Sequence, residues 1–403
     1  MSIMPAVAAT VHATAHVNPI MYITVSGDIL GTFRQWTGGI RDTSQTSITY
    51  SAQFFDLARK RQRAGIVLGN APVSREESSR DMTIAVGPAA EGGSGLVFHF
   101  RMVMRALANC WQIWRRAPTD VIVMDGAGYW FPLALISRPG RRIYLSIHTV
   151  LWSTKPGRLR RIALQAEAWF IRTRCDGVLA VSDTIADQVS TLCNGKHPPI
   201  RVFSPTYVDD DFVDVKPARS DPECFEILYA GRIEEGKGVF DLIEIAQQLI
   251  KRQVPPFRIT ICGSGTDLAT LQERIRAEQL EHVMLCLGHQ QRSAMIEQLS
   301  NASCLIAPTR STFVEGFNKV VVEAVLAGRP VITSRVCPAL QEVAEAAVEV
   351  EPDDVTQYAD AIERLMLDHA MFDHKVAATH GLKRKFLDFD NSWMAGADAI
   401  LAG

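Results

Sequence analysis

The sequence predicts an α/β protein built from two Rossmann-like domains whose parallel sheets face a central cleft. Short apolar runs alternate with helix-period segments of about 10–15 residues along the whole chain, which is the pattern of βαβ units and parallel sheets. A proline-rich, acidic segment near the middle interrupts this alternation once. With 403 residues, 47% of them apolar, the chain is long enough for two or three domains that each bury a core.

Strands and helices alternate before the interruption. The expected strands are Met21–Ser26, Ile66–Leu68, Thr83–Val86, Val121–Met124, Ile143–Ile147, Val178–Val181 and Ile200–Phe203. The expected helices are Thr43–Gln62, Phe98–Arg115, Leu159–Thr173 and Thr184–Leu192. Each crossover between parallel strands should be right-handed.

The same alternation resumes after the interruption. The expected strands are Phe225–Ala230, Arg258–Cys262, Val283–Leu287, Cys304–Ile306, Val331–Thr333 and Val348–Val350. The expected helices are Val239–Lys251, Asp267–Glu278, Arg292–Ser300, Lys319–Ala327, Ala339–Ala344 and Thr356–Leu367. Ligands of open α/β sheets bind at the carboxyl ends of the strands, so two facing sheets would form a site for two substrates.

Domain boundaries follow from these elements. We expect a loose tail over residues 1–19, a first domain over 20–205, a linker over 206–223, a second domain over 224–385 and a final helix within 386–403 that returns to the first domain. The tail has no basic residue before Arg34 and no long apolar run, so it lacks the pattern of a signal peptide. No stretch approaches the roughly 18 uninterrupted apolar residues of a membrane span.

The first motif with chemical content reads GRIEEGKG and follows the first strand of the second half. Gly231 and Lys237 have the spacing of a P-loop. However, Gly238 stands where a P-loop needs Ser or Thr for Mg²⁺, and the two glutamates would repel phosphate. Arg232 and Lys237 instead suit a diphosphate, as two fixed cations on a strand-to-helix turn. An ordinary charged surface loop is the alternative.

Two further motifs fall at later strand ends. Gly263-Ser264-Gly265 is half of a dinucleotide fingerprint, and an ordinary tight turn explains it equally well. Glu315 and Glu323 are eight residues apart around the start of a helix, with Gly316 allowing a ligand to approach the backbone closely. We expect free helix N-terminal amides that could bind an anion at Phe317, Asn318 and Lys319.

Together these residues resemble the retaining family-4 glycosyltransferases of GT-B fold. The resemblance covers Phe225 to about Leu367, and the Glu-x7-Glu segment is its specific part. In the first half, Gly38-Gly39 looks like the glycine-rich first loop of that family. His148 looks like its cleft histidine, and Ser182 looks like its later strand-end serine.

The resemblance implies a role for each site residue. Arg232 and Lys237 would hold the donor diphosphate and stabilise the leaving group, and Glu315 would contact hydroxyls of the donor sugar. Glu323 would bind the ribose, and His148 would hydrogen-bond the sugar or the acceptor. The expected donor-binding residues are Gly38, Gly39, Gly231, Gly263, Gly265, Gly288, His289, Gly316, Phe317, Asn318, Lys319 and Glu323.

The resemblance also implies the reaction. A hexosyltransferase of this type would move a sugar, with retention, from a UDP- or GDP-linked donor on the second domain to a hydroxyl of a glycan or lipid-linked acceptor on the first. Polysaccharide or glycolipid biosynthesis would be its setting, without metal or cofactor. A phosphate oxygen would take the acceptor proton, and attack would occur on the face that the diphosphate leaves.

Other classes of protein stay open. The first loop lacks the small-acidic pair that often follows its glycines, and Gly316-Phe317-Asn318-Lys319 replaces the Ser-Phe-Gly of many members, so the donor sugar is not fixed. A GT-B sugar-nucleotide epimerase would turn over a donor without an acceptor. A non-catalytic protein that binds a nucleotide sugar or NAD is another alternative, although NAD would require a complete glycine fingerprint.

The charge is uneven along the chain. Residues 1–204 carry 23 Lys and Arg against 13 Asp and Glu, and the remainder carries 19 against 31. In the first half, basic residues flank apolar aromatic segments, a combination that can dock a protein on an anionic membrane. These residues are Trp111, Trp114, Arg115, Arg116, Arg138, Arg141, Arg142, Lys155, Arg158, Arg160, Arg161, Trp169, Phe170, Arg172 and Arg174. Core aromatics beneath a solvated basic face are the alternative.

The remaining composition restricts location and partners. The aromatics lie in apolar helix segments rather than as stacking platforms, so no nucleic acid is expected. The eight cysteines are scattered without paired spacing, which indicates reduced thiols. We therefore expect a cytoplasmic protein, with attachment to the inner face of a membrane as an open extension.

Overall fold

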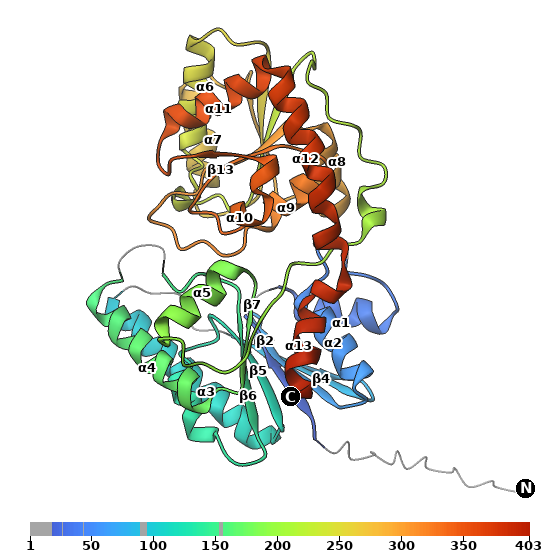
Figure 1. Ribbon diagram of the computed structural model, residues 1–403, viewed down its shortest axis with the longest axis vertical. Helices are drawn as coiled ribbons and strands as arrows, with labels where there is room; N and C mark the ends of the chain where they lie inside the picture. The colour runs from blue at the N-terminus through green and yellow to red at the C-terminus, as the bar shows by residue number, and fades with distance from the viewer. Residues whose placement is uncertain (1–17, 26, 43, 89–94, 153–155) are drawn as a thin grey trace, which may run out of the picture.

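The computed structural model describes residues 18–25, 27–42, 44–88, 95–152 and 156–403. Figure 1 shows two α/β units, one above the other, each built around its own sheet. The predicted α/β fold with two parallel-sheet domains is confirmed. None of the helices in the described ranges is long and apolar enough to cross a bilayer.

The first domain contains an eight-stranded sheet in the order β3-β4-β2-β1-β5-β6-β7-β8. Its strands are β1 (Ile20–Ile23), β2 (Gly65–Asn70), β3 (Arg75–Ser78), β4 (Met82–Gly87), β5 (Asp120–Met124), β6 (Arg142–Ile147), β7 (Gly177–Ala180) and β8 (Ile200–Val202). Its helices are α1 (Ile29–Thr37), α2 (Tyr50–Lys60), α3 (Gly95–Arg116), α4 (Arg158–Arg174) and α5 (Asp183–Leu192), with short 3₁₀ turns η1 (Phe131–Ile136) and η2 (Asp209–Phe212). Only β3, a charged edge strand, pairs antiparallel among these strands.

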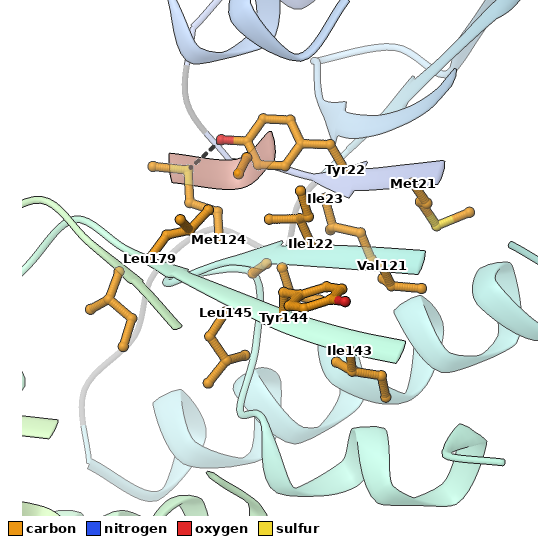
Figure 2. Close-up of a cluster of buried hydrophobic side chains, with 14 of the residues drawn as sticks. Met21, Tyr22, Ile23, Val121, Ile122, Met124, Ile143, Tyr144, Leu145 and Leu179 are labelled. Carbon is orange, nitrogen blue, oxygen red and sulfur yellow. Dashed lines mark hydrogen bonds between the residues drawn. The ribbon is translucent and has the colours of Figure 1, made fainter. Parts of the chain in front are cut away.

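The central strands of this sheet are mainly apolar, as expected for strands whose two faces are both covered by helices. Figure 2 shows side chains of β1, β5 and β6 packed together. Tyr22 and Met124 are both buried, and the Tyr22 hydroxyl lies 3.9 Å from the Met124 sulfur. Such doubly covered strands have continuous apolar runs, which explains why the sequence predicted them well.

The second domain contains a six-stranded, all-parallel sheet in the order β11-β10-β9-β12-β13-β14. Its strands are β9 (Phe225–Ala230), β10 (Phe257–Cys262), β11 (Met284–Gly288), β12 (Cys304–Ala307), β13 (Val331–Ser334) and β14 (Ala347–Val350). Its helices are α6 (Asp241–Lys251), α7 (Leu268–Ala277), α8 (Arg292–Asn301), α9 (Lys319–Leu326), α10 (Leu340–Val343), α11 (Val355–Leu367) and α12 (His369–Leu387), with 3₁₀ turns η3 (Glu235–Lys237) and η4 (Ala344–Ala346).

The end of the chain returns to the first domain. In Figure 1 the red helix α12 runs down from the second domain, and α13 (Trp393–Ala402) lies against the first. The turn η5 (Phe389–Asn391) separates the two helices. Asp398 of α13 is ion-paired with Lys60 and Arg61 at the end of α2, at 2.7 and 2.6 Å.

The expected helix Thr43–Gln62 is wrong in its first part. The structure has a separate helix α1 before it, and α2 begins only at Tyr50, where the Thr49 hydroxyl accepts from the Ala52 amide at 3.3 Å. Residues 44–49 form a loop, and position 43 lies outside the described residues. Capping by Thr49 explains the late start, because the segment before it is mostly polar and lacks an apolar helical face. The expected N-terminal tail also lies outside the described residues, apart from Asn18 and Pro19.

Candidate active site

The carboxyl ends of the two parallel sheets face each other, and a short antiparallel bridge joins the loops between them. Thr149, after β6, pairs with Gly316, before α9. The Phe317 amide donates to the His148 carbonyl at 3.2 Å, and the Val150 amide donates to the Glu315 carbonyl at 3.4 Å. Two predicted site residues from different domains, His148 and Glu315, therefore lie at one junction.

This bridge corrects one prediction about the helix N-terminus. The Phe317 amide is not free for an anion, because it is already bonded to His148. A Cβ at Gly316 would lie 3.0 Å from the same carbonyl, so this glycine lets the two backbones approach. Among the residues that the structure describes, no acceptor faces the amides of Asn318 and Lys319.

Lys237 and Glu315 form a buried ion pair. The Lys237 Nζ lies 2.7 and 2.5 Å from the two carboxylate oxygens, and the Thr309 hydroxyl donates to one of them at 2.9 Å. The side chains are only 11% and 6% exposed. Gly238 follows with φ 73°, and a Cβ there would lie 2.0 Å from the Pro308 carbonyl oxygen. The positive φ and the nearby Pro308 carbonyl thus explain why position 238 is a glycine and not the Ser or Thr of a P-loop.

Arg232 lies beside this pair but is exposed to solvent. Its side chain is 61% exposed and pairs with Glu234 at 2.9 Å. The guanidinium of Arg232 and the ammonium of Lys237 both lie over the ring of Phe313, at 5.3 and 4.9 Å from its centre. Phe313 lies two residues before Glu315, and no sequence motif predicted a role for it. Its ring places the two predicted phosphate-binding cations next to each other.

The glycine turns after β9, β10 and β11 pack against one another. The Gly231 amide donates to Cys262 O at 3.0 Å, and the Gly263 amide donates to Gly288 O at 2.8 Å. Added Cβ atoms would lie 1.8 Å from Gly231 O at Gly263, and 2.2 Å from Ile233 O at Gly265. These glycines are needed for loop packing, so their role in base binding stays a prediction, as does that of the exposed His289 beside them.

His148 lies at the end of β6 in a largely apolar environment. Burial, with a smaller effect from Lys319, lowers its pKa to about 3, so the ring is neutral. Its backbone amide donates to Asp125 Oδ1 at 2.9 Å, and Asp125 also accepts from the Thr149 amide at 2.9 Å. Burial raises the pKa of Asp125 to about 6. Asp125 directly follows the predicted strand Val121–Met124, but no sequence motif marked it as a site residue.

Two side chains of α9 reach the loop before α2. The Lys319 ammonium is 3.0 Å from Ser47 Oγ and 4.9 Å from the centre of the Tyr50 ring. Glu323 accepts a hydrogen bond from the Thr46 hydroxyl. Burial lowers the pKa of Lys319 and raises that of Glu323. Glu323 therefore makes a hydrogen bond to the first domain. Its expected contact with ribose stays a prediction.

The predicted first loop lies next to these contacts. Gly38 ends α1, and Gly39 has a positive φ of 70° with no atom within 4 Å of the position of a Cβ. Arg41 donates from its guanidinium to the Thr46 carbonyl at 2.7 Å. The loop that holds both glycines is thereby tied to the segment that contacts Lys319 and Glu323.

A cavity of about 250 Å³ lies between the domains. Its walls come mainly from the first domain, with Phe317 and Lys319 from the second. They include Thr24, Gln45, Thr49, Tyr50, Met124, His148 and Val181. Hydroxyls, one ammonium and one imidazole line this pocket, and such a set of polar groups suits a polyhydroxylated ligand.

Two family models cover the two halves of the chain in sequence order. The model of the glycosyltransferase family 4 matches residues 70–210, and the model of the glycosyl transferases group 1 matches residues 212–378. Together they cover roughly three quarters of the sequence. The chain belongs to the group 1 glycosyltransferases. The resemblance inferred from the Glu-x7-Glu segment is thereby confirmed at the level of the family.

Named relatives of this glycosyltransferase act on varied molecules. The glycogen synthase of Mycobacterium tuberculosis (strain H37Rv) is 28% identical over 245 residues, which are 60% of this chain and 57% of that protein. The alpha-D-kanosaminyltransferase of Streptomyces kanamyceticus is 26% identical over 262 residues, 60% of this chain and 66% of that protein. The chain thus matches less than two thirds of the length of these relatives.

Solved structures of similar fold cover nearly the whole glycosyltransferase. The sucrose-phosphate synthase of Thermosynechococcus elongatus has a TM-score of 0.70 at 17% identity, over 96% of this chain and 97% of that one. HepE of Anabaena, solved in complex with UDP and glucose, has a TM-score of 0.63 at 16% identity, over 96% and 98%. The predicted GT-B fold is confirmed.

Proposed function

We propose that this glycosyltransferase moves a sugar, with retention of configuration, from a UDP- or GDP-linked donor to a hydroxyl of a glycan or lipid-linked acceptor. Polysaccharide or glycolipid biosynthesis would be the setting. The observation that supports this best is the buried pair Lys237–Glu315, joined through the Gly316 bridge to His148 of the opposite domain. One site then offers a cation for phosphate and a carboxylate for sugar hydroxyls.

The two cations would hold the donor diphosphate. An ammonium has three donors, and Lys237 directs two hydrogen bonds to Glu315, so a third remains for a phosphate oxygen. Arg232 is exposed and can turn from Glu234 to the second phosphate. Fixed positive charges aimed at the leaving group stabilise the transition state, typically by a few kcal/mol each. Because Lys237 and Arg232 would provide the positive charge that a metal ion otherwise provides, we propose a metal-independent reaction.

The transfer itself would take place on one face of the sugar. The bond between the anomeric carbon and the phosphate oxygen breaks as the bond to the acceptor oxygen forms, and the acceptor proton passes to a phosphate oxygen of the leaving diphosphate. Glu315, bonded to Lys237 and Thr309, would orient donor hydroxyls. The solved complex of HepE with UDP-glucose supports a UDP-linked donor as the first one to test.

An assay with donor and acceptor separates this function from its alternatives. The protein is mixed with UDP- and GDP-sugars, with and without EDTA and a panel of glycan and lipid-linked acceptors, and the product anomer is read by NMR. We expect acceptor-dependent release of the nucleoside diphosphate and a product with the donor's anomeric configuration. Conversion of the donor without an acceptor would instead identify an epimerase. Inversion of configuration would contradict the retaining mechanism.

The surface of α3 supports a membrane-bound acceptor. Five of its apolar residues are exposed at intervals of four and three positions, which places them along one stripe. They are Phe100, Met104, Leu107, Trp111 and Trp114. The alternative of core aromatics is wrong for Trp111 and Trp114, which are 53% and 68% exposed, and is right for Phe170, which is fully buried.

Helix α4 extends this surface. Helices α3 and α4 both pack against η1, whose Leu135 is exposed. Ile162 and Trp169 are exposed on α4, where several arginines also lie. We propose that this surface, α3 with η1 and α4, docks on an anionic membrane and brings the cleft to its acceptor. Lys155, also expected there, lies outside the described residues.

Vesicle binding tests this docking. We expect the protein to sediment with vesicles rich in phosphatidylglycerol and not with pure phosphatidylcholine, and we expect Trp111→Ala with Trp114→Ala to reduce binding at least 10-fold. Leu367→Ala is the control, because Leu367 is similarly exposed on the second domain. Equal binding by the double variant and the wild type would contradict the proposal.

A further inference from the structure

We propose that a groove in the first domain binds the diphosphate of a lipid-linked acceptor through arginines, while the lipid chain lies on the exposed apolar residues of α3. This α3 groove has a volume of about 940 Å³ and is lined by α3 from Phe100 to Arg116 and by the ends of β2 and β4 at Asn70 and Gly87. It shares no lining residue with the 250 Å³ cavity. The lipid-linked acceptor rests on the proposed function, whereas the arginines and the apolar residues belong to the protein alone.

The walls of the α3 groove carry an excess of positive charge. Among the described residues, five arginines line it against a single carboxylate, that of Glu76, and no lysine or histidine lies there. The arginines are Arg75, Arg101, Arg105, Arg115 and Arg116. A planar guanidinium donates two parallel hydrogen bonds to a phosphate, whereas an ammonium acts as a point charge. The composition of the walls therefore suits an anion with phosphate oxygens.

Arg105, in the middle of α3, is a partly buried cation without a carboxylate partner among the described residues. Its Nη2 donates to the neutral Asn70 side-chain oxygen at 2.6 Å, and burial lowers its pKa. Removing a charge from water is costly unless an opposite charge compensates it. The other N–H groups of the guanidinium bond no described residue and are not fully buried, so a ligand in the groove can reach them. An anion bound there would supply the missing negative charge.

Arg115 and Arg116 extend the positive charge to the end of α3. The Arg116 Nη2 is 2.6 Å from Glu76 Oε2, and the two side chains are 14% and 54% exposed. The guanidinium carbon of Arg115 lies 5.5 Å from the centre of the Trp111 ring. These contacts hold both arginines beside the groove, where Glu76 is the one described carboxylate that offsets them. A ligand with more than one negative charge, such as a diphosphate, matches this run of cations better than a single carboxylate does.

Helix α3 presents the groove and the apolar stripe side by side. Groove residues recur at positions 101, 105, 108, 112 and 115, and each exposed apolar residue of the stripe comes one position earlier. Consecutive residues of a helix are about 100° apart, so the two rows run next to each other along its surface. Phe100, Met104 and Trp111 belong to both, since they are exposed and also line the groove. A phosphate bound in the groove would thus place an attached apolar chain on the stripe.

The α3 groove adjoins the cleft at the end of β1. Asn70 lines the groove, and its side-chain amide donates to the Val25 carbonyl at 3.1 Å. Thr24, the residue before Val25, lines the 250 Å³ cavity. A sugar attached to a diphosphate in the groove would therefore extend toward the cleft. A neutral glycan would leave the arginines unused, and a free nucleotide would leave the stripe unused, whereas a lipid-linked diphosphate uses both.

Calorimetric titration of the full chain with small probes tests the groove. Geranyl diphosphate carries both the anion and an apolar chain, inorganic diphosphate lacks the chain, and geranyl glucoside lacks the anion. We expect geranyl diphosphate to bind at least about 10-fold more tightly than either of the other two, because only it fills the groove and the stripe. Equal affinity for geranyl diphosphate and inorganic diphosphate would overturn the role of the stripe, and equal affinity for geranyl glucoside would overturn that of the arginines.

A variant of Arg105 tests the phosphate contact. Arg105→Gln should raise the Kd of geranyl diphosphate about 10-fold. Arg80→Gln is the matched control, because Arg80 is an exposed arginine of the same domain, on the turn between β3 and β4 and outside the groove. Arg105→Gln should not lower the unfolding temperature, since it removes a cation that no described carboxylate balances. A loss of binding in Arg232→Ala but not in Arg105→Gln would assign the probe to the donor site and overturn the inference.

A double variant of the stripe tests the lipid contact. Phe100→Ala with Trp111→Ala should lower the affinity for geranyl diphosphate to that for inorganic diphosphate and should leave the affinity for inorganic diphosphate unchanged. Short-chain phosphatidylglycerol is titrated in parallel. If it binds as tightly as geranyl diphosphate and with the same dependence on Arg105, the groove takes ordinary membrane lipids, and the inference is overturned.

Kinetics separate this inference from the proposed function. With a nucleotide sugar and a lipid-linked diphosphate acceptor, Arg105→Gln should raise the KM of the acceptor about 10-fold and leave kcat and the KM of the donor unchanged. Turnover with the same acceptor KM in Arg105→Gln and in the wild type would overturn the inference and leave the proposed function intact. Binding of geranyl diphosphate that depends on Arg105, without turnover of any nucleotide sugar, would instead overturn the proposed function, and with it the assignment of the bound lipid diphosphate as an acceptor.

Discussion

Lys237 and Glu315 are the residues on which the proposed chemistry depends most. Each neutralises the other in a site from which water is largely excluded, so neither can be removed alone without leaving a buried charge. The pair therefore links stability and activity. Because these two effects have different origins, variants can separate them.

Lys237→Ala should destabilise the protein by about 3–5 kcal/mol, because it leaves the Glu315 carboxylate buried without its cation. It should also lower transfer about 10²–10³-fold through loss of a phosphate-binding charge. Adding Glu315→Gln should restore most of the stability but none of the activity. Urea unfolding and initial rates measure the two effects, and an unstable double variant would contradict this explanation.

Arg232→Ala should leave the unfolding midpoint unchanged, because the side chain is mainly exposed. It should raise the Kd of the nucleoside diphosphate about 10-fold, as measured by calorimetric titration. Arg258→Ala is the matched control, since Arg258 is also half-exposed and paired with a glutamate but lies at the start of β10, away from the cleft. Equal effects of the two variants would show that Arg232 does not bind phosphate.

Spacing along the sequence predicted the charged residues of the cleft but not the side chains that hold them in position. Glu315, Lys237 and Arg232 belong to local motifs whose residues lie close together in the chain. Phe313 and Asp125 matter through contacts with residues from other elements, which a single sequence does not show. The Phe317 amide failed as a prediction for the same reason, because its acceptor, His148, comes from the other domain.

Among the elements, α4 contains a buried titratable group outside the cleft. Glu167 on α4 pairs with Arg160 at 3.2 Å, and burial raises its pKa to about 7 from the usual 4.5. The native protein therefore holds a proton at this residue between about pH 4.5 and 7, where the unfolded chain has lost it. Stability falls as the pH rises through this window.

Glu167→Gln should abolish the fall in stability with rising pH, because Gln does not titrate. The variant should gain stability relative to the wild type between pH 5 and pH 8, by at most about 3 kcal/mol. Thermal unfolding at several pH values measures the difference. Glu244→Gln, at an exposed position of α6, is the control and should show no such trend. A difference that stays constant with pH would contradict the raised pKa of Glu167.

Elements with strong apolar patterns were predictable, and those with narrow buried faces were not. The buried strands of both sheets were placed within a few residues. Helix α12 escaped prediction because only three of its 19 residues are buried, at intervals of seven: Phe372, Thr379 and Phe386. The edge strand β3, with its sequence REES, has no apolar alternation at all.

At the scale of the whole molecule, the function depends on how the two domains meet. The Thr149–Gly316 bridge and the contacts of Lys319 and Glu323 hold the sheets face to face across the cavity. Helix α13 packs against the first domain, where the Trp393 indole donates to the Ser146 hydroxyl of β6. None of these contacts lies within one sequence motif. The sequence therefore predicted a cleft between two domains but not the contacts that join the domains.

The central claim is that this cleft binds a nucleoside diphosphate sugar through Lys237 without a metal. Calorimetric titration of UDP, GDP, ADP, ATP and NAD, once in the presence of EDTA and once with Mg²⁺, tests it most directly. We predict that UDP or GDP binds the wild type and that binding is lost in the Lys237→Ala, Glu315→Gln double variant. Binding of ATP only with Mg²⁺, or of NAD alone, would contradict the account.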